Sequence, residues 1–82
     1  MKYLDCVEVI VEKDEYAKHV VHKGMQGVIW LKESIDGTWD VFFDLYGENA
    51  PIGDIAVKEE DLKLISKMDA KINEQIKAKF SK

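Results

Sequence analysis

Residues 22–45 read HKGMQGVIWLKESIDGTWDVFFDL, and this stretch predicts two strands joined by a tight turn. Gly24 and Gly27 precede the first strand, where glycine permits a sharp turn or a close approach of two backbones. Residues 28–31 are Val, Ile, Trp and Leu, which favour strands. Asp36-Gly37 between two apolar runs is a strong signal for a hairpin turn.

Side chains alternate in character along the second strand of this hairpin, residues 38–45. One face carries Trp39, Val41, Phe43 and Leu45, and the other carries Thr38, Asp40, Phe42 and Asp44. A period of two with one polar face is typical of a half-buried antiparallel strand, so we expect the first set to point inward. Phe42 is the exception, because it places an aromatic ring on the otherwise polar face.

Length and composition indicate one small folded domain. The 82 residues are 46% hydrophobic, which is ordinary for a globular fold and argues against disorder. No apolar run approaches the roughly 20 residues that span a bilayer, and Asp5 and Glu8 interrupt the apolar segment of a signal peptide. The single cysteine, Cys6, cannot form an internal disulfide and fits a reducing compartment. We therefore expect a cytoplasmic protein.

Residues 1–65 carry the pattern of a small antiparallel barrel. Five short strands are expected, at residues 4–12, 28–31, 38–45, 55–58 and 63–65. In the first strand Val7, Val9 and Val11 alternate with other residues and should face inward. Short strands separated by frequent turns are typical of sandwiches and barrels.

The connections between these strands are polar or contain glycine and proline. Residues 13–18 predict an exposed loop or a single helical turn, and residues 19–22 predict a short extended piece. Residues 46–53 hold two glycines and the only proline, and predict a loop. Residues 59–62 predict a tight helical turn, whose acids Glu59, Glu60 and Asp61 form a charge cluster at the helix start.

Residues 66–82 predict an amphipathic helix. Ser66 is the expected N-cap, with Asp69 in the position of a capping-box acid. An apolar side chain recurs at every fourth position of one face: Met68, Ile72, Ile76 and Phe80. Such a helix is marginal by itself in water, so this stripe docks on its own barrel, on a second copy or on another protein.

The turn before the hairpin carries a motif known from other proteins. Lys23-Gly24-Met25-Gln26-Gly27-Val28 is similar to the Lys-Gly-x-x-Gly-x-Val turn of KOW-type modules, and residues 39–43 and 59–62 resemble a group of uncharacterised small bacterial domains. The resemblance covers residues 4–65 and implies a five-stranded SH3-like antiparallel barrel, here with a C-terminal helix. Barrels of this type bind peptides, proteins or nucleic acids, and the fold alone does not fix the function.

Charge is divided unevenly along the chain. Residues 1–61 hold 6 lysines against 14 acidic residues, a net charge of −8, whereas residues 62–82 hold 6 lysines against 2, a net charge of +4. All cations are lysine, although arginine is favoured for recognition of phosphates and base edges. The acidic body argues against a nucleic-acid partner and favours a basic protein.

The residue types that carry catalysis or metal binding are not grouped in this sequence. Cys6 lies among strand residues, where a thiol is usually inert. His19 and His22 are three positions apart, which places them on opposite faces of a strand. We therefore expect no catalytic, cofactor or metal site.

The sequence supports three functional hypotheses. The first is a non-enzymatic acidic protein-binding module, for example an immunity or antitoxin-type inhibitor, with candidate contacts Trp30, Phe42, Tyr46, Asp40, Asp44 and Glu48. The second is a KOW-like nucleic-acid accessory domain that uses Lys23, Lys63, Lys67, Lys71, Lys77 and Lys79. The third is a homodimer joined through Met68, Ile72, Ile76 and Phe80. Phe42 is either covered by the C-terminal helix or part of an exposed aromatic patch, since aromatic residues are enriched in binding hot spots.

Overall fold

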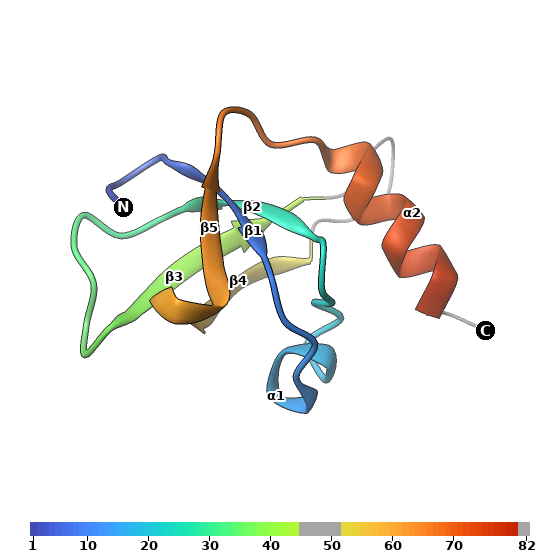
Figure 1. Ribbon diagram of the computed structural model, residues 1–82. Helices are drawn as coiled ribbons and strands as arrows, with labels where there is room; N and C mark the ends of the chain where they lie inside the picture. Colours follow the sequence, from blue (N-terminus) through green and yellow to red (C-terminus); the bar gives the residue numbers. More distant parts are fainter. Residues whose placement is uncertain (45–51, 81–82) are drawn as a thin grey trace.

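The strands of the computed structural model, which describes residues 1–44 and 52–80, form one antiparallel sheet (Figure 1). They are β1 (Cys6–Val9), β2 (Gln26–Ile29), β3 (Thr38–Phe43), β4 (Gly53–Lys58) and β5 (Leu62–Ile65), in the spatial order β4-β3-β2-β1-β5. The prediction of a mainly β fold with five antiparallel strands is confirmed. Within the described residues β4 and β5 are the two edges and do not pair with each other, so the sheet is not closed into the expected barrel.

The central hairpin forms where the sequence predicts it. β2 and β3 are antiparallel, with Ile29 opposite Val41. Asp36 and Gly37 both adopt left-handed backbone angles, with φ of 52° and 74°. Two such residues in a row give a turn whose twist matches that of the flanking strands.

Gly27 lies inside β2 and not in the turn before it. A Cβ atom at this position would lie 2.7 Å from the carbonyl oxygen of Phe42 and 2.7 Å from the side chain of Val41, so only glycine lets β3 approach. β2 begins at Gln26, before the apolar run that predicted it. Gly24, with a φ of 93°, makes the turn.

The chain between β1 and β2 is less extended than the sequence suggests. β1 ends at Val9, well before residue 12. The predicted helical turn is present as α1 (Asp14–Ala17). The prediction of an extended piece at residues 19–22 is wrong, because the N–H groups of His19 and Val20 donate to the carbonyl oxygens of α1 and turn the chain.

The core lies on one side of the sheet. Trp39, Val41 and Phe43 point into it as predicted, and Val7 and Val9 are fully buried. Val11 is only partly buried at the margin, because it follows the end of β1. The remaining core residues are Tyr16, Val21, Met25, Ile29, Val57 and Leu62. Leu45, expected on the same face, lies outside the described residues.

A buried polar junction joins α1 to the short helical turn η1 (Glu59–Asp61) that precedes β5. Asp61 Oδ2 accepts hydrogen bonds from Tyr16 Oη at 2.6 Å and from Lys13 Nζ at 2.7 Å. Burial by itself raises the pKa of Asp61, but the two donors outweigh it and hold that pKa below its ordinary value. Burial, then the hydrogen bond to Asp61, raises the pKa of Tyr16 to about 12.

This junction tests the expectations for residues 13–18 and 59–62. The helical turn at residues 59–62 is present. Glu59, Glu60 and Asp61 make up its first turn, as expected of a charge cluster at the helix start. Asp61 is nevertheless buried, where Lys13 and Tyr16 bind its carboxylate. Of the two alternatives for residues 13–18, the helical turn is the one present, and its Tyr16 is a core residue.

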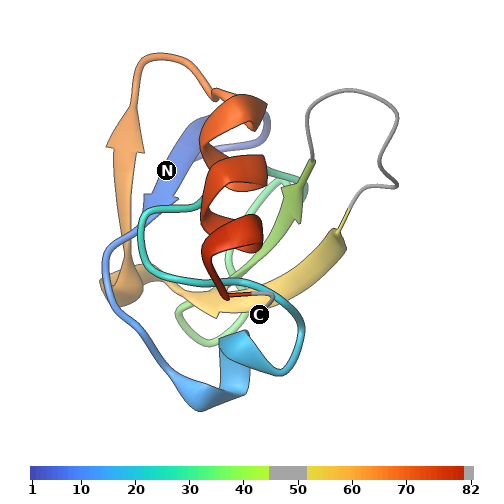
Figure 2. The ribbon, with the colours of Figure 1, turned by 90° about the vertical axis from the view of Figure 1, so that its right-hand side faces the viewer.

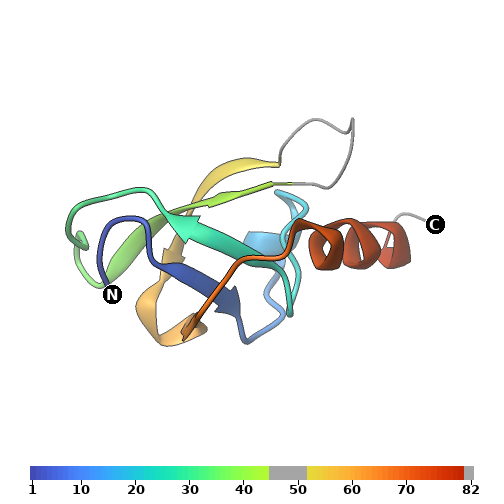
Figure 3. The ribbon, with the colours of Figure 1, turned by 90° about the horizontal axis from the view of Figure 1, so that it is seen from above.

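Helix α2 (Ala70–Phe80) packs at one end of the sheet, beside the start of β2 (Figures 2 and 3). Asp69 is its N-cap, because Asp69 Oδ1 accepts the N–H of Lys71 at 2.9 Å. The prediction that Ser66 is the cap is wrong, since residues 66–69 connect the end of β5 to the helix (Figure 1).

Asn73 fastens α2 to β2. Its Oδ1 accepts the N–H of Gln26 at 2.7 Å, and its Nδ2 donates to the Gln26 carbonyl oxygen at 2.7 Å. Nδ2 also donates to the carbonyl oxygen of Asp44 at 2.8 Å. The fully buried amide therefore satisfies backbone groups that would otherwise be left unpaired at the end of the sheet.

The apolar stripe of α2 supports the same docking. Ile76 packs against the core, and a Cβ atom at Gly24 would lie 3.1 Å from Ile76 Cδ1. The Phe80 ring stacks on His22 with a centroid separation of 3.8 Å. Of the docking partners that the sequence left open, the structure shows the helix packed on its own sheet.

Candidate binding groove

An apolar groove lies on the face of the sheet opposite the core. Its volume is about 560 Å³, and it is lined by Leu4, Val28, Trp30, Phe42, Asp44, Asp54 and Met68. Strand register explains the position: Val28 lies opposite Phe42, which in turn lies opposite Asp54. Neighbouring positions of β2, β3 and β4 therefore form its floor.

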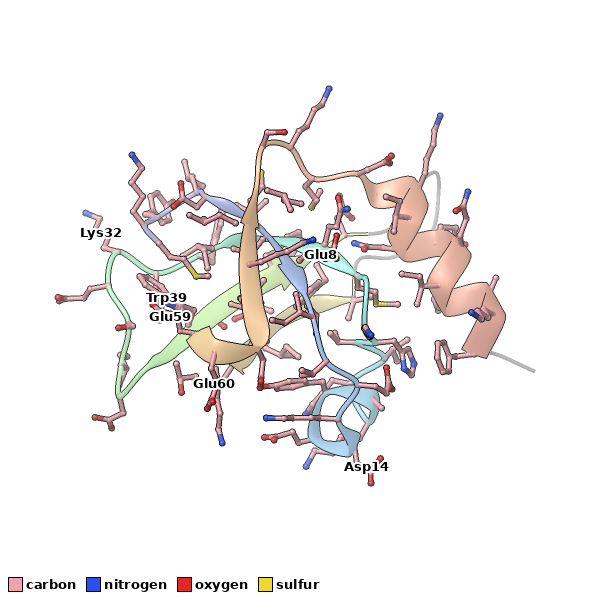
Figure 4. All side chains as sticks on the ribbon, in the orientation of Figure 1. Glu8, Asp14, Lys32, Trp39, Glu59 and Glu60 are labelled. Atoms are coloured by element: carbon pink, nitrogen blue, oxygen red, sulfur yellow. The ribbon has the colours of Figure 1, made fainter. Side chains whose placement is uncertain are left out.

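The two tryptophans lie on opposite faces of the sheet. Trp39 belongs to the core, and its Nε1 donates to Glu59 Oε1 at 2.8 Å (Figure 4). Trp30 faces outward, and half of the residue's surface, 50%, is exposed. Its ring lies 6.2 Å from that of Phe42 and 5.7 Å from that of Tyr3, measured between centroids. Trp30 thus adjoins two further aromatic rings, of which that of Phe42 also lines the groove.

Leu4 occupies one wall of the groove in a strained conformation. Its φ of 71° lies in the left-handed region, which is unfavourable for a branched apolar residue. The N–H of Leu4 donates to the carbonyl oxygen of Ile29 at 2.8 Å, which holds the segment in place. Its side chain is nevertheless exposed. Strain of this kind is often found where a segment is shaped for binding.

Two carboxyl groups interact directly beside the groove. Asp54 lines it from β4, and a hydrogen bond joins its side chain to that of Asp40 on β3. Burial, then the hydrogen bond and the charge of Asp54, raises the pKa of Asp40 to about 6. The charged form of Asp40 is therefore disfavoured, as expected for two acids at close range.

The structure brings together part of the predicted contact set. Trp30, Phe42 and Asp44 line one groove, and Asp40 adjoins it through Asp54. Tyr46 and Glu48 lie outside the described residues.

The predicted helix stripe is divided between two places. Met68 precedes α2 and lines the groove, whereas Ile76 and Phe80 contact the sheet end and His22. Ile72 is half-buried. Among the described residues no position of α2 itself lines the groove, whereas Trp30 and Phe42 both do. Of the two alternatives for Phe42, the groove therefore favours the aromatic patch. Asn73 holds the helix at the end of β2, away from the groove floor.

Sequence reasoning missed Leu4, Val28 and Asp54 as groove residues. The hairpin turn pairs Ile35 with Thr38. If the two arms stayed paired residue by residue from there, Phe42 would lie opposite residue 31. It lies opposite Val28 instead, because the first arm of the hairpin contains extra unpaired residues. Only the pairing of β3 with β4 places Asp54 here, and no local pattern indicates it.

The histidines and the cysteine do not form a second site. His22 Nδ1 lies 2.8 Å from Glu12 Oε2, while His19 is exposed. Burial by itself raises the pKa of Glu12, but hydrogen bonds from the Lys23 N–H and from His22 lower it overall. In residues 1–44 and 52–80 no three His, Cys, Asp or Glu side chains are grouped closely enough to hold a metal ion.

Comparison with known proteins leaves this groove as the main guide to function. No protein-family model matches the chain, and no curated protein or solved structure matches it either. In the described part of the chain, no helix has the length and apolar character that crossing a membrane requires.

Proposed function

We propose that this chain is a non-enzymatic protein-binding module of the SH3-like barrel type, and that the groove receives its partner. The observation that carries the proposal is the open apolar groove with its exposed aromatic ring, Trp30. Apolar patches rimmed by polar groups mark interaction sites, and aromatic residues dominate binding hot spots. The barrel assignment is supported by the five-strand order, by η1 before β5 and by the Lys-Gly-x-x-Gly-x-Val motif.

The partner is a basic protein. Asp44 and Asp54 line the groove and no described lysine does. Residues 1–61 carry a net charge of −8. Complementary charge speeds the capture of a partner and suppresses wrong ones. This chemistry fits an inhibitor of a basic protein, such as an immunity or antitoxin-type protein.

A capture experiment with matched variants tests the groove. The wild-type protein, Trp30→Ala and Leu64→Ala are immobilised and exposed to a nuclease-treated native lysate. Leu64 is the control because it is 56% exposed, close to the 50% of Trp30, but lies on the edge strand β5 outside the groove. We expect one stoichiometric basic protein that binds wild type and Leu64→Ala and is lost with Trp30→Ala.

Two results contradict this proposal. A partner retained by Trp30→Ala but lost with Leu64→Ala would move the interface to the β5 edge. An affinity that does not change between low and high salt would reject the electrostatic part, because exposed charges are screened by salt.

The nucleic-acid hypothesis rests on the basic C-terminal part. Lys71, Lys77 and Lys79 lie on α2, within the segment that carries a net charge of +4. Binding through these lysines should weaken steeply as salt is raised. The absence of any mobility shift of RNA or DNA at low salt would reject it.

The homodimer hypothesis needs the stripe of α2 to leave its own sheet. Ile76 and Phe80 are already in contact with the core and His22. Deleting residues 67–82 should abolish any dimer if the stripe forms it. A truncated protein that still dimerises in sedimentation experiments would reject the stripe as the interface.

A further inference from the structure

Asp40 lies directly beside the exposed tryptophan. The N–H of Trp30 donates to the carbonyl oxygen of Asp40 at 2.8 Å, which makes the two residues cross-strand neighbours on the outward face. On its other side Asp40 lies opposite Ala56, and the outward positions of β4 that flank Ala56 are Asp54 and Lys58. The small Ala56 side chain adds no ring there, so the rings that flank the carboxyl pair are those of Trp30 and of Phe42, which lies opposite Asp54.

The carboxyl pair has no cation among the groups that shift the pKa of Asp40, which are burial and Asp54. Lys58, at the end of β4, instead lowers the pKa of Asp61. Two carboxylates at close range repel each other when both are ionised. A cation placed between them relieves that repulsion and makes charge-assisted hydrogen bonds.

We propose that the groove recognises a partner segment that presents a lysine or arginine side chain next to an apolar side chain. The cation binds the Asp40–Asp54 pair and lies against the Trp30 indole. The apolar neighbour enters the groove against Val28, Phe42 and Met68. This inference rests on the proposed function and names the chemistry that the groove selects.

The arrangement of the groove requires these two features to be adjacent in the partner. Asp54 both lines the groove and bonds Asp40, so the cation site and the apolar site share a wall. An indole face attracts a lysine or arginine cation by about 0.5–2 kcal/mol, depending on how far the site is desolvated. A cation without an apolar neighbour leaves the groove unfilled, and an apolar side chain without a cation leaves the carboxyl pair without a counter-ion.

Selection from a displayed library of random dodecapeptides tests the inference. Wild type is compared with three variants: Asp40→Asn/Asp54→Asn, the control Asp14→Asn/Glu60→Gln, and Trp30→Ala. The control removes the same two charges from exposed positions on α1 and η1, outside the groove (Figure 4). Circular dichroism checks that each variant is folded. The strongest peptide is then synthesised with its basic residue and with glutamine in its place.

We expect wild type and the control to select peptides with Lys or Arg next to an apolar residue. Glutamine in place of the basic residue should weaken binding to wild type about tenfold, and less than twofold to Asp40→Asn/Asp54→Asn. Peptides that depend on Trp30 but lack a basic residue would overturn the inference and leave the proposed function intact. A library that gives no Trp30-dependent peptide would reject the groove as a protein-binding site and the inference with it.

Discussion

Two carboxylate sites of this protein, Asp61 and Asp40, differ in what surrounds them. Asp61 accepts hydrogen bonds from Lys13 and Tyr16, and its pKa is lowered. Asp40 bonds another acid, Asp54, and its pKa is raised to about 6. Burial raises the pKa of both groups, so it does not explain why the two pKa values shift in opposite directions. The hydrogen-bond donors explain it, because only Asp61 has a cation and a hydroxyl at its oxygen.

The contrast separates a structural site from a binding site. The Asp61 junction joins α1 to η1, and all its hydrogen-bond partners come from the chain itself. The same holds for Asn73, whose amide pairs the backbone N–H and carbonyl of Gln26. The Asp40–Asp54 pair gains nothing for the fold from its mutual repulsion and lies beside an open groove. Groups arranged against stability are typical of functional sites.

The largest expected effect is the loss of the Asp61 junction. Asp61→Ala leaves the Tyr16 hydroxyl and the Lys13 ammonium without their shared acceptor, and should lower the free energy of unfolding at pH 7 by about 3 kcal/mol. Urea unfolding measures it, with Asp14→Ala, an exposed acid of α1, as the control. A loss below about 1 kcal/mol would show that Lys13 and Tyr16 find other partners.

The second effect concerns the amide that holds α2. Asn73→Leu leaves the N–H and carbonyl of Gln26 without their side-chain partner. It should lower the free energy of unfolding by about 2 kcal/mol. Hydrogen exchange should speed up at the Gln26 amide and along α2. The exposed Gln75→Leu on the same helix is the control. Unchanged exchange at Gln26 would mean that the helix stays docked without Asn73.

The third effect is a gain in stability on replacing Asp40, and its size depends on pH. Because the folded state raises the pKa of Asp40 to about 6, it binds a proton that the unfolded chain releases near its ordinary value. This contribution to stability is complete below about pH 4 and is lost as the pH rises to about 6. The titratable side chains that face Asp40 are Asp54 and Lys58 of β4, while the β2 side presents Trp30.

Replacing Asp40 should therefore stabilise the protein at neutral pH. Asp40→Asn is expected to gain about 1 kcal/mol at pH 7, after allowance for solvent screening, and nothing at pH 4. Urea unfolding from pH 4 to pH 8 checks this, with the exposed Glu60→Gln as the control. A destabilised Asp40→Asn at pH 7 would show that the carboxylate has a stabilising partner in the fold.

The smallest effect on stability is expected where the effect on binding is largest. Trp30→Ala should change the free energy of unfolding by less than about 1 kcal/mol, because half of the residue's surface is already exposed. The same variant should abolish capture of the partner. A loss of several kcal/mol would place Trp30 among the residues that hold the fold and remove it as a clean test of binding.

Local patterns predicted the elements better than their ends. The hairpin turn at Asp36-Gly37 and the inward set Trp39, Val41 and Phe43 are confirmed, because turn chemistry and the two-residue period are properties of neighbouring residues. β2 begins earlier than predicted and includes Gly27, whose close contact with β3 involves residues distant in the sequence. Local spacing predicts a cap at Ser66, but the helix begins at Ala70, after the cap Asp69.

By itself, then, the sequence determined a mainly β domain with a C-terminal helix, an acidic body and an outward Phe42. Only the tertiary structure decided that Phe42 meets Val28 and Asp54, and that Asp61 is buried between Lys13 and Tyr16. The physical reason is the range of the interactions. Periodicity and turns depend on adjacent residues, whereas a groove or a pKa depends on which distant strands are paired, and that register is fixed by the packing of the whole core.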